Sequence, residues 1–212
     1  MTAVVVIGAG GFGREALDVL EAAERADPGR FTILGVVDDA PSDAALARLA
    51  DRSIPYLGAL DDWLASVPDA GYVIGVGSPA ARERIEQRLE AAGLHPVTVV
   101  HPQAVIGSRV RIGEGSVICG GVQISTNVGL GRAVHLNPGA VIGHDAELSD
   151  FVSVNPGAIV SGEVRVGRGT LLGAGSVVLQ GLTVGEGSTV GAAACVTRDV
   201  ADSAVVKGVP AR

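Results

Sequence analysis

The sequence predicts an α/β Rossmann-like domain over residues 1–98, followed by a parallel β-helix over residues 99–200. Two patterns carry this prediction. Val, Ile or Leu stands at every sixth position from Val100 to Val196 without a miss, and a hexapeptide period is the signature of a parallel β-helix. Before this repeat, strand-like and helix-like segments alternate, which is typical of a doubly wound parallel sheet.

Composition agrees with this division and excludes several functions. Hydrophobic residues make up 47% of the chain but aromatic residues only 3%, so the core must be built from small aliphatic side chains. Cys119 and Cys195 form neither a disulfide framework nor a zinc site. With no signal peptide and no apolar membrane segment, we expect a cytoplasmic protein. Residues 1–98 hold 15 acidic and 8 basic side chains, and residues 99–212 hold 8 of each. Neither part has the excess of basic residues that is typical of nucleic-acid binding.

The N-terminal domain is expected to begin with a strand, a glycine loop and a helix that runs to about Glu24. The last expected helix of this domain is amphipathic, with Pro79 at its start and Gly93 closing it. The expected strands are Ala3–Ile7, Phe31–Val37, Tyr56–Leu57, Tyr72–Val76 and Val97–Val100, and the further helices are Asp43–Ala50, Leu60–Val67 and Pro79–Ala92.

The glycine loop Gly8-Ala-Gly-Gly-Phe-Gly13 matches the phosphate-binding pattern G-x-G-x-x-G. Free N–H groups and the positive end of the helix dipole attract phosphate at such a loop, and Asp38 and Asp39 end the second strand, where a ribose or base is reached. Three interpretations stand beside one another: a dinucleotide site, a turn needed only for packing, and another nucleotide-diphosphate site. We favour the last, because the domain lacks a second mononucleotide half and one half suffices for one nucleotide.

The repeat also predicts which residues meet. Three hexads make one triangular turn, so residues 18 apart stack at the strand spacing. His135 then lies over Ser153, and His144 lies over Gly162, where a backbone N–H and an open slot face the imidazole. A neutral imidazole can accept a proton near neutral pH. The spacing of the histidines does not suit a metal, so none is expected.

The last residues, 201–212, are expected to form a tail that caps the open end of the coil, which repeat proteins need. The only lysine of the chain, Lys207, lies in this tail. Its charge could also meet an anionic ligand.

The glycine loop, Asp38-Asp39, Gly75-Val-Gly77, the uninterrupted coil, His144-Asp145 and the final Gly-Val-Pro-Ala-Arg together resemble the bacterial hexapeptide sugar acetyltransferases. These include UDP-4-amino-sugar N-acetyltransferases and sialic acid O-acetyltransferase-like proteins. The resemblance covers nearly the whole chain. It implies a left-handed β-helix, a homotrimer with acetyl-CoA between neighbouring coils, and a nucleotide-linked sugar or other small molecule as acceptor.

The resemblance also implies roles for individual residues. His144 would be the general base, Asp145 the carboxylate that orients it, and Gly162 the N–H donor to the thioester oxygen. Two residues depart from the family pattern, since Phe12 and Ser153 stand where many members carry His. The expected acetyl-CoA contacts are Asn137, Ser153, Ala174, Ala192 and Lys207, and the expected nucleotide-sugar contacts are Gly10, Gly11, Phe12, Asp38, Asp39 and Gly77.

The sequence therefore predicts direct acetyl transfer from acetyl-CoA to an amine or hydroxyl, without an acyl-enzyme. N- and O-acetylation both remain open, as the acceptor is not visible in the residues. Two other classes stay as alternatives: a non-catalytic sugar-nucleotide or CoA-binding scaffold, which the His-Asp pair disfavours, and an NAD-linked enzyme, which the glycine loop would suit.

Overall fold

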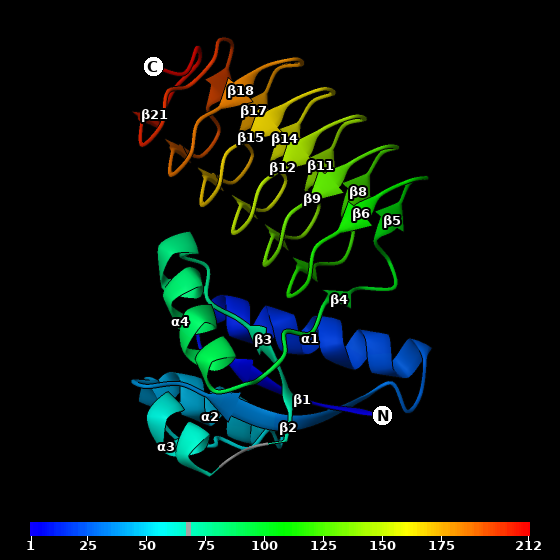
Figure 1. The fold of residues 1–212 in the computed structure, drawn as a ribbon, viewed down its shortest axis with the longest axis vertical. Helices are drawn as coiled ribbons and strands as arrows, with labels where there is room; N and C mark the ends of the chain where they lie inside the picture. Colours follow the sequence, from blue (N-terminus) through cyan, green and yellow to red (C-terminus); the bar gives the residue numbers. More distant parts are fainter. Residues whose placement is uncertain (67–68) are drawn as a thin grey trace. The chain divides into compact units, whose positions relative to one another are not determined.

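The computed structural model describes residues 1–66 and 69–212, which form two compact units, Met1–Val100 and His101–Arg212 (Figure 1). The fold class predicted from the sequence is confirmed, since an α/β unit is followed by a parallel β-helix of stacked coils. Within the described residues, none of the helices is long and apolar enough to span a membrane.

The first unit is a three-stranded parallel sheet in the order β2-β1-β3. Because β1 lies between the strands that follow it in sequence, its carboxyl end is the switch point where α/β sheets bind ligands. The strands are β1 (Thr2–Ile7), β2 (Phe31–Val37) and β3 (Gly71–Ile74), and the helices are α1 (Gly11–Ala26), α2 (Asp43–Asp51), α3 (Leu60–Ala65) and α4 (Pro79–Ala91).

Most expected elements of this unit are present, with local differences. Tyr56 makes only an isolated bridge to Val36 in place of a short strand. The third strand ends at Ile74 rather than Val76, and α3 ends at Ala65, so the predicted extension to Val67 lies outside the described residues. The predicted strand Val97–Val100 is reduced to β4 (Val99–Val100), which is ordered with the strands of the coil and not with β2-β1-β3.

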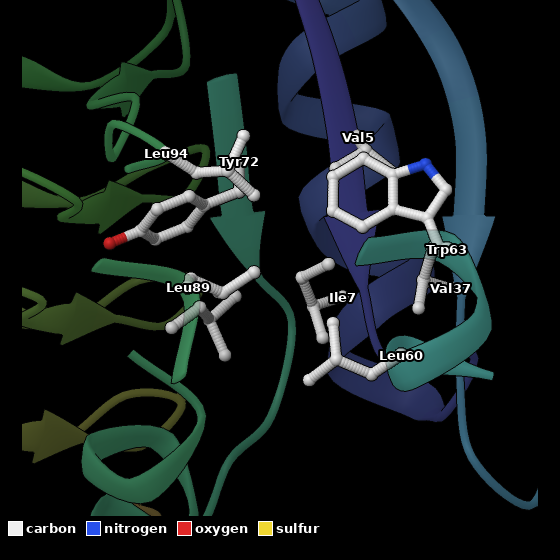
Figure 2. Close-up of a cluster of buried hydrophobic side chains, with 9 residues drawn as sticks. Val5, Ile7, Val37, Leu60, Trp63, Tyr72, Leu89 and Leu94 are labelled. Atoms are coloured by element: carbon white, nitrogen blue, oxygen red, sulfur yellow. The ribbon is translucent and has the colours of Figure 1, made fainter. Parts of the chain in front are cut away.

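An apolar cluster holds the helices onto this sheet. Figure 2 shows Leu60 and Trp63 of α3 facing Ile7 and Val5 of β1, with Leu89 of α4 in the same cluster. Fully burying such side chains stabilises a fold by about 1.5–3 kcal/mol each. This packing fixes the loops at the carboxyl ends of β1 and β2, on which the predicted nucleotide site depends.

The coil consists of three parallel sheets of two-residue strands that stack along its axis (Figure 1). The first sheet contains β4, β7 (Val117–Ile118), β10 (His135–Leu136), β13 (Ser153–Val154), β16 (Leu171–Leu172), β19 (Thr189–Val190) and β21 (Val205–Val206). The second contains β5 (Val105–Ile106), β8 (Gln123–Ile124), β11 (Val141–Ile142), β14 (Ile159–Val160), β17 (Val177–Val178) and β20 (Cys195–Val196). The third contains β6 (Arg111–Ile112), β9 (Gly129–Leu130), β12 (Glu147–Leu148), β15 (Arg165–Val166) and β18 (Thr183–Val184).

The 18-residue register is confirmed. His135 pairs with Ser153, and Ile142 pairs with Val160. Aliphatic residues at the repeat positions fill the interior, as Leu136 and Val154 are fully buried. The coil therefore stacks equivalent turns on one another, and each corner becomes a column of residues 18 apart.

The last turn of the coil is shorter than the repeat predicts. Val184 pairs with Val200, and Thr189 pairs with Val205, so the register falls to 16 residues. The final segment then returns to the coil, where the Ala211 N–H donates to the Cys195 carbonyl at 2.7 Å. Residues 201–212 thus extend the first sheet by one strand.

Candidate active site

His144 and Asp145 lie in the turn that follows β11, at the corner between the second and third sheets. The imidazole Nδ1 is 2.7 Å from Oδ2 of Asp145. The pKa of the Asp145 carboxyl lies below its ordinary value because of the hydrogen bond from His144 and a second one from Asn127. An ionised carboxylate only accepts hydrogen bonds, so the neutral form of the imidazole carries its proton on Nδ1 and leaves the lone pair on Nε2.

The imidazole lies directly against the next coil, as the register predicts. A Cβ built on Gly162 would be 2.6 Å from both Nε2 and Cε1 of His144, so only glycine leaves room for this ring. Within the described part of the chain, the Gly162 N–H donates no hydrogen bond. The His144 side chain is 57% exposed. The corner therefore presents a proton acceptor beside an available backbone donor.

Sequence reasoning missed a third member of this group, Asn127. Its Nδ2 donates to Oδ1 of Asp145 at 3.0 Å, from the turn between β8 and β9. Asn127 precedes Asp145 by 18 residues, so the same column rule that paired His144 with Gly162 contains this contact. A cavity of about 540 Å³ borders Asp145, and its other walls come from Glu147, Glu163, Arg165, Gly181 and Thr183.

The residues predicted to contact acetyl-CoA do not gather at this corner in a single chain. Ala174 and Ala192 are exposed in the turns after β16 and β19, at the corner between the first and second sheets. Ser153 is buried in β13 beside His135. Lys207 is exposed after β21, and its backbone N–H donates to the Arg212 carbonyl at 3.0 Å.

The side chain of Asn137 forms hydrogen bonds within the β-helix. Its side chain is buried, and Nδ2 donates to the Val154 carbonyl at 3.0 Å and lies 3.5 Å from Oδ1 of Asn155 in the next coil. The sequence Asn-Pro-Gly-Ala occurs at 137–140 and again at 155–158, 18 residues on, so these two turns stack and their asparagines form a ladder. The amide of Asn137 stabilises this corner, whatever else it contacts.

The glycine loop joins β1 to α1 at the switch point of the sheet. Gly8 has φ +111°, a conformation that suits glycine, and its N–H donates to the Val37 carbonyl at 2.7 Å. A Cβ on Gly13 would be 1.8 Å from the Gly8 carbonyl oxygen, so this glycine lets the helix pack on the loop. Packing therefore accounts for two of the four glycines in the loop.

Packing does not account for Gly10, Gly11 and Gly77. Their φ values are not in the left-handed region, and among the described residues a Cβ on any of them would meet nothing within 4 Å. Gly10 is the N-cap residue of α1 and Gly11 its first residue, with Phe12 half-buried behind them. Gly10 and Gly11 leave the N-terminus of α1 without side chains, so a phosphate can approach its N–H groups.

The two aspartates hold the neighbouring loops in place. Asp38 accepts from the Ala9 N–H through Oδ2 at 2.7 Å and from the Ala40 N–H through Oδ1 at 2.9 Å. Asp39 accepts from the Leu60 N–H at 2.8 Å. Both carboxylates keep lone pairs for a ligand. They border a cavity of about 140 Å³ whose other walls are Ile7, Gly8, Val37, Leu60, Val76 and Ile85.

The described residues contain no group of three or more His, Cys, Asp or Glu side chains that could hold a metal ion.

Comparison with known proteins assigns the family. The PglD N-terminal domain family matches residues 3–89. A histidine variant of perosamine N-acetyltransferase from Caulobacter crescentus, solved in complex with CoA and GDP-perosamine, is 30% identical over 100% of this chain and 96% of that one, with a TM-score of 0.89. The chain belongs to the hexapeptide-repeat sugar N-acetyltransferases. The resemblance seen in the sequence is therefore confirmed.

Other members of this N-acetyltransferase family are similar over different lengths. The acetyltransferase domain of PglB from Neisseria gonorrhoeae is 28% identical, with coverage of 100% and 99% and a TM-score of 0.85. GDP-perosamine N-acetyltransferase of Escherichia coli O157:H7 is 30% identical over 132 residues, 62% of this chain. The matched region spans 58% of that curated relative and 48% of UDP-N-acetylbacillosamine N-acetyltransferase from Bacillus subtilis.

Proposed function

We propose that this protein transfers the acetyl group of acetyl-CoA to the amino group of a nucleotide-linked amino sugar. The family supports both substrates, since its Caulobacter member was solved with CoA and GDP-perosamine. The observation that carries the proposal is the contact between the His144 imidazole, held by Asp145, and the backbone of Gly162.

His144 acts as the general base. Its Nε2 takes a proton from the sugar amine as the amine nitrogen attacks the thioester carbonyl carbon. The new C–N bond forms, the C–S bond breaks, and CoA leaves as the thiol with the proton that His144 held. The Gly162 N–H donates to the oxyanion of the tetrahedral intermediate, a kind of contact whose loss costs about 2.7–4 kcal/mol. Both cysteines stay outside this reaction.

The N-terminal unit binds the nucleotide part of the acceptor. The N-terminus of α1 at Gly10 and Gly11 suits a diphosphate, because its N–H groups and its dipole favour negative charge. A Cβ on Gly77 would meet nothing within 4 Å among the described residues, so the space beside it can take part of the ligand. The largely apolar cavity beside Asp38 and Asp39 suits a base or ribose, whose N–H or O–H groups a carboxylate accepts.

The active enzyme is a homotrimer with acetyl-CoA between neighbouring coils. His144 and Ala174 lie at different corners of the β-helix. One chain alone therefore does not bring the general base to the expected acetyl-CoA contacts. A neighbouring copy would supply the second corner. The reaction takes place in the cytoplasm, the compartment that the sequence predicts for this protein.

A coupled assay of free CoA tests the function. The wild-type protein should release CoA from acetyl-CoA in the presence of a GDP-, UDP- or dTDP-linked 4-amino sugar, and not with the matching 4-hydroxy sugar. The variant His144→Asn should lose about 10²–10⁴-fold in kcat, the usual contribution of a general base. Thermal shift with the same panel identifies the nucleotide.

His101→Asn is the matched control, because His101 lies at the entrance of the coil, where its Nδ1 accepts from the Gln103 N–H at 3.0 Å. It should keep wild-type turnover. The proposal fails if no amino sugar supports CoA release, or if His144→Asn turns over at the rate of the wild type.

A further inference from the structure

The stacked turns of the β-helix hold Asn127, the third residue of the His144 group, in a fixed position next to Asp145. Asn127 and Asp145 occupy the same place in successive turns, with φ +60° and +59°. The backbone repeats the same bond at both levels, since the Asn127 N–H donates to Ser108 at 3.0 Å and the Asp145 N–H donates to Thr126 at 3.1 Å. The Asn127 amide is therefore held directly beneath the carboxylate.

This arrangement gives each carboxylate oxygen of Asp145 one fixed donor. Oδ2 faces Nδ1 of His144 at 2.7 Å, and Oδ1 faces Nδ2 of Asn127 at 3.0 Å. Asp145 is exposed, so without the amide its carboxylate could rotate and exchange His144 for water. A carboxylate held at both oxygens keeps one tautomer of the imidazole, with Nε2 unprotonated.

The chemical type of Asn127 fits this task. An amide donates without adding charge, so it does not compete with the imidazole as a cation at this position would. The charged groups around the same cavity are Glu147, Glu163 and Arg165. Asn also tolerates the left-handed backbone of this turn better than most residues.

We propose that Asn127 is a positioning residue for the general base: it holds Asp145 so that His144 keeps its Nδ1–H tautomer. This inference rests on the proposed function. It predicts that the side chain acts on turnover and not on substrate affinity, because the Asn127 amide acts through Asp145, to which it donates at 3.0 Å.

The test uses two variants that both accept positive φ. Asn127→Gly removes the amide, and Asn127→Asp keeps the shape but no longer donates. Each should lower kcat about tenfold, the low end of what loss of an outer partner typically costs, with KM for both substrates within about twofold of wild type. Arg109→Gly is the matched control, at the same place one coil earlier with φ +60° and an exposed side chain.

The ¹⁵N spectrum of histidine-labelled full-length protein gives a readout that a purely structural role would not change. Wild type should show His144 as one Nδ1–H tautomer, assigned by its loss in His144→Asn, and both Asn127 variants should show a mixture of tautomers. Wild-type kcat or an unchanged tautomer in these variants would overturn the inference. If the wild type acetylates no acceptor, the proposed function fails, while the tautomer still decides the role of Asn127.

Discussion

The imidazole of His144 occupies the space that a side chain at position 162 would fill. A Cβ built on Gly162 would be 2.6 Å from Nε2, closer than real Cβ contacts come. The ring and the glycine therefore form one unit, in which the absence of a side chain on one coil sets the position of the base on the coil before it. This unit can be tested apart from the fold, because Gly162 is not in a left-handed conformation.

Gly162→Ala should displace the imidazole and leave the coil intact. We expect at least a tenfold loss of kcat, since a base that is about 1 Å out of place can cost up to roughly 10²-fold. The Tm should change little, because His144 is exposed and can turn outward. Steady-state kinetics and a melting curve measure the two effects.

The matched control for this substitution is Gln180→Ala, which places the same side chain at the same turn position one coil further on. Its turnover should stay near wild type. Full activity of Gly162→Ala would show that the close contact with His144 has no part in catalysis.

Asp145→Asn should separate the electrostatic role of the carboxylate from its shape. Asn accepts the φ of +59° at this position, but its amide no longer enforces a proton on Nδ1 of His144. We expect a large loss of kcat with little change in KM, as a wrong tautomer costs about 10⁴ in a serine protease triad. Kinetics at pH 7 test this; wild-type kcat would contradict it.

The pH dependence of stability provides a second measurement on Asp145. Its folded-state pKa is lowered, so ionisation stabilises the folded chain above the unfolded pKa of about 3.9, and this contribution is lost as pH falls through the folded value. The Tm difference between wild type and Asp145→Asn should be small at pH 7, because the pair is exposed, and should shrink as the pH falls below the unfolded pKa and through the lower folded pKa. A gap that widens on acidification would contradict the assignment.

The coil could be predicted almost completely, because its geometry is periodic. Once three hexads make a turn, subtraction of 18 pairs His144 with Gly162, and the same subtraction from Asp145 gives Asn127. The sequence also predicts that His144 and Ala174 lie at different corners, since they differ by 30 residues, which is not a multiple of 18. The shortened last turn could not be predicted, because Val200 continues the apolar pattern although the pairing of Val184 with Val200 spans 16 residues in place of 18.

The N-terminal site was less predictable because its contacts join loops that no period relates. The sequence places Asp38 and Asp39 at the end of a strand, but not their bonds to the Ala9 and Leu60 backbone. Likewise, all glycines of the loop look alike in sequence. Only the structure distinguishes Gly13, where a Cβ would collide with the Gly8 carbonyl oxygen, from Gly10 and Gly11, where a Cβ would meet nothing within 4 Å.

Two glycine substitutions should reveal this difference. Gly13→Ala places a Cβ 1.8 Å from the Gly8 carbonyl oxygen, so the first unit should lose about 3 kcal/mol or more of stability. Gly77→Val projects into open space, so the Tm should hold while KM for the nucleotide sugar rises at least about fivefold, roughly 1 kcal/mol of binding. Equal effects of both on stability would argue against a ligand at Gly77.

The final prediction concerns Asn137, which is expected from the sequence to contact acetyl-CoA and which the structure shows bonded within the coil. Its buried amide donates to the Val154 carbonyl, so Asn137→Ala should lower the free energy of unfolding by about 0.5–1.5 kcal/mol, the net value of one hydrogen bond. KM for acetyl-CoA should stay within about twofold. Asn155→Ala, the equivalent change one coil on, serves as the comparison. If Asn137→Ala alone raises that KM tenfold at unchanged stability, the residue contacts the cofactor and its ladder role is secondary.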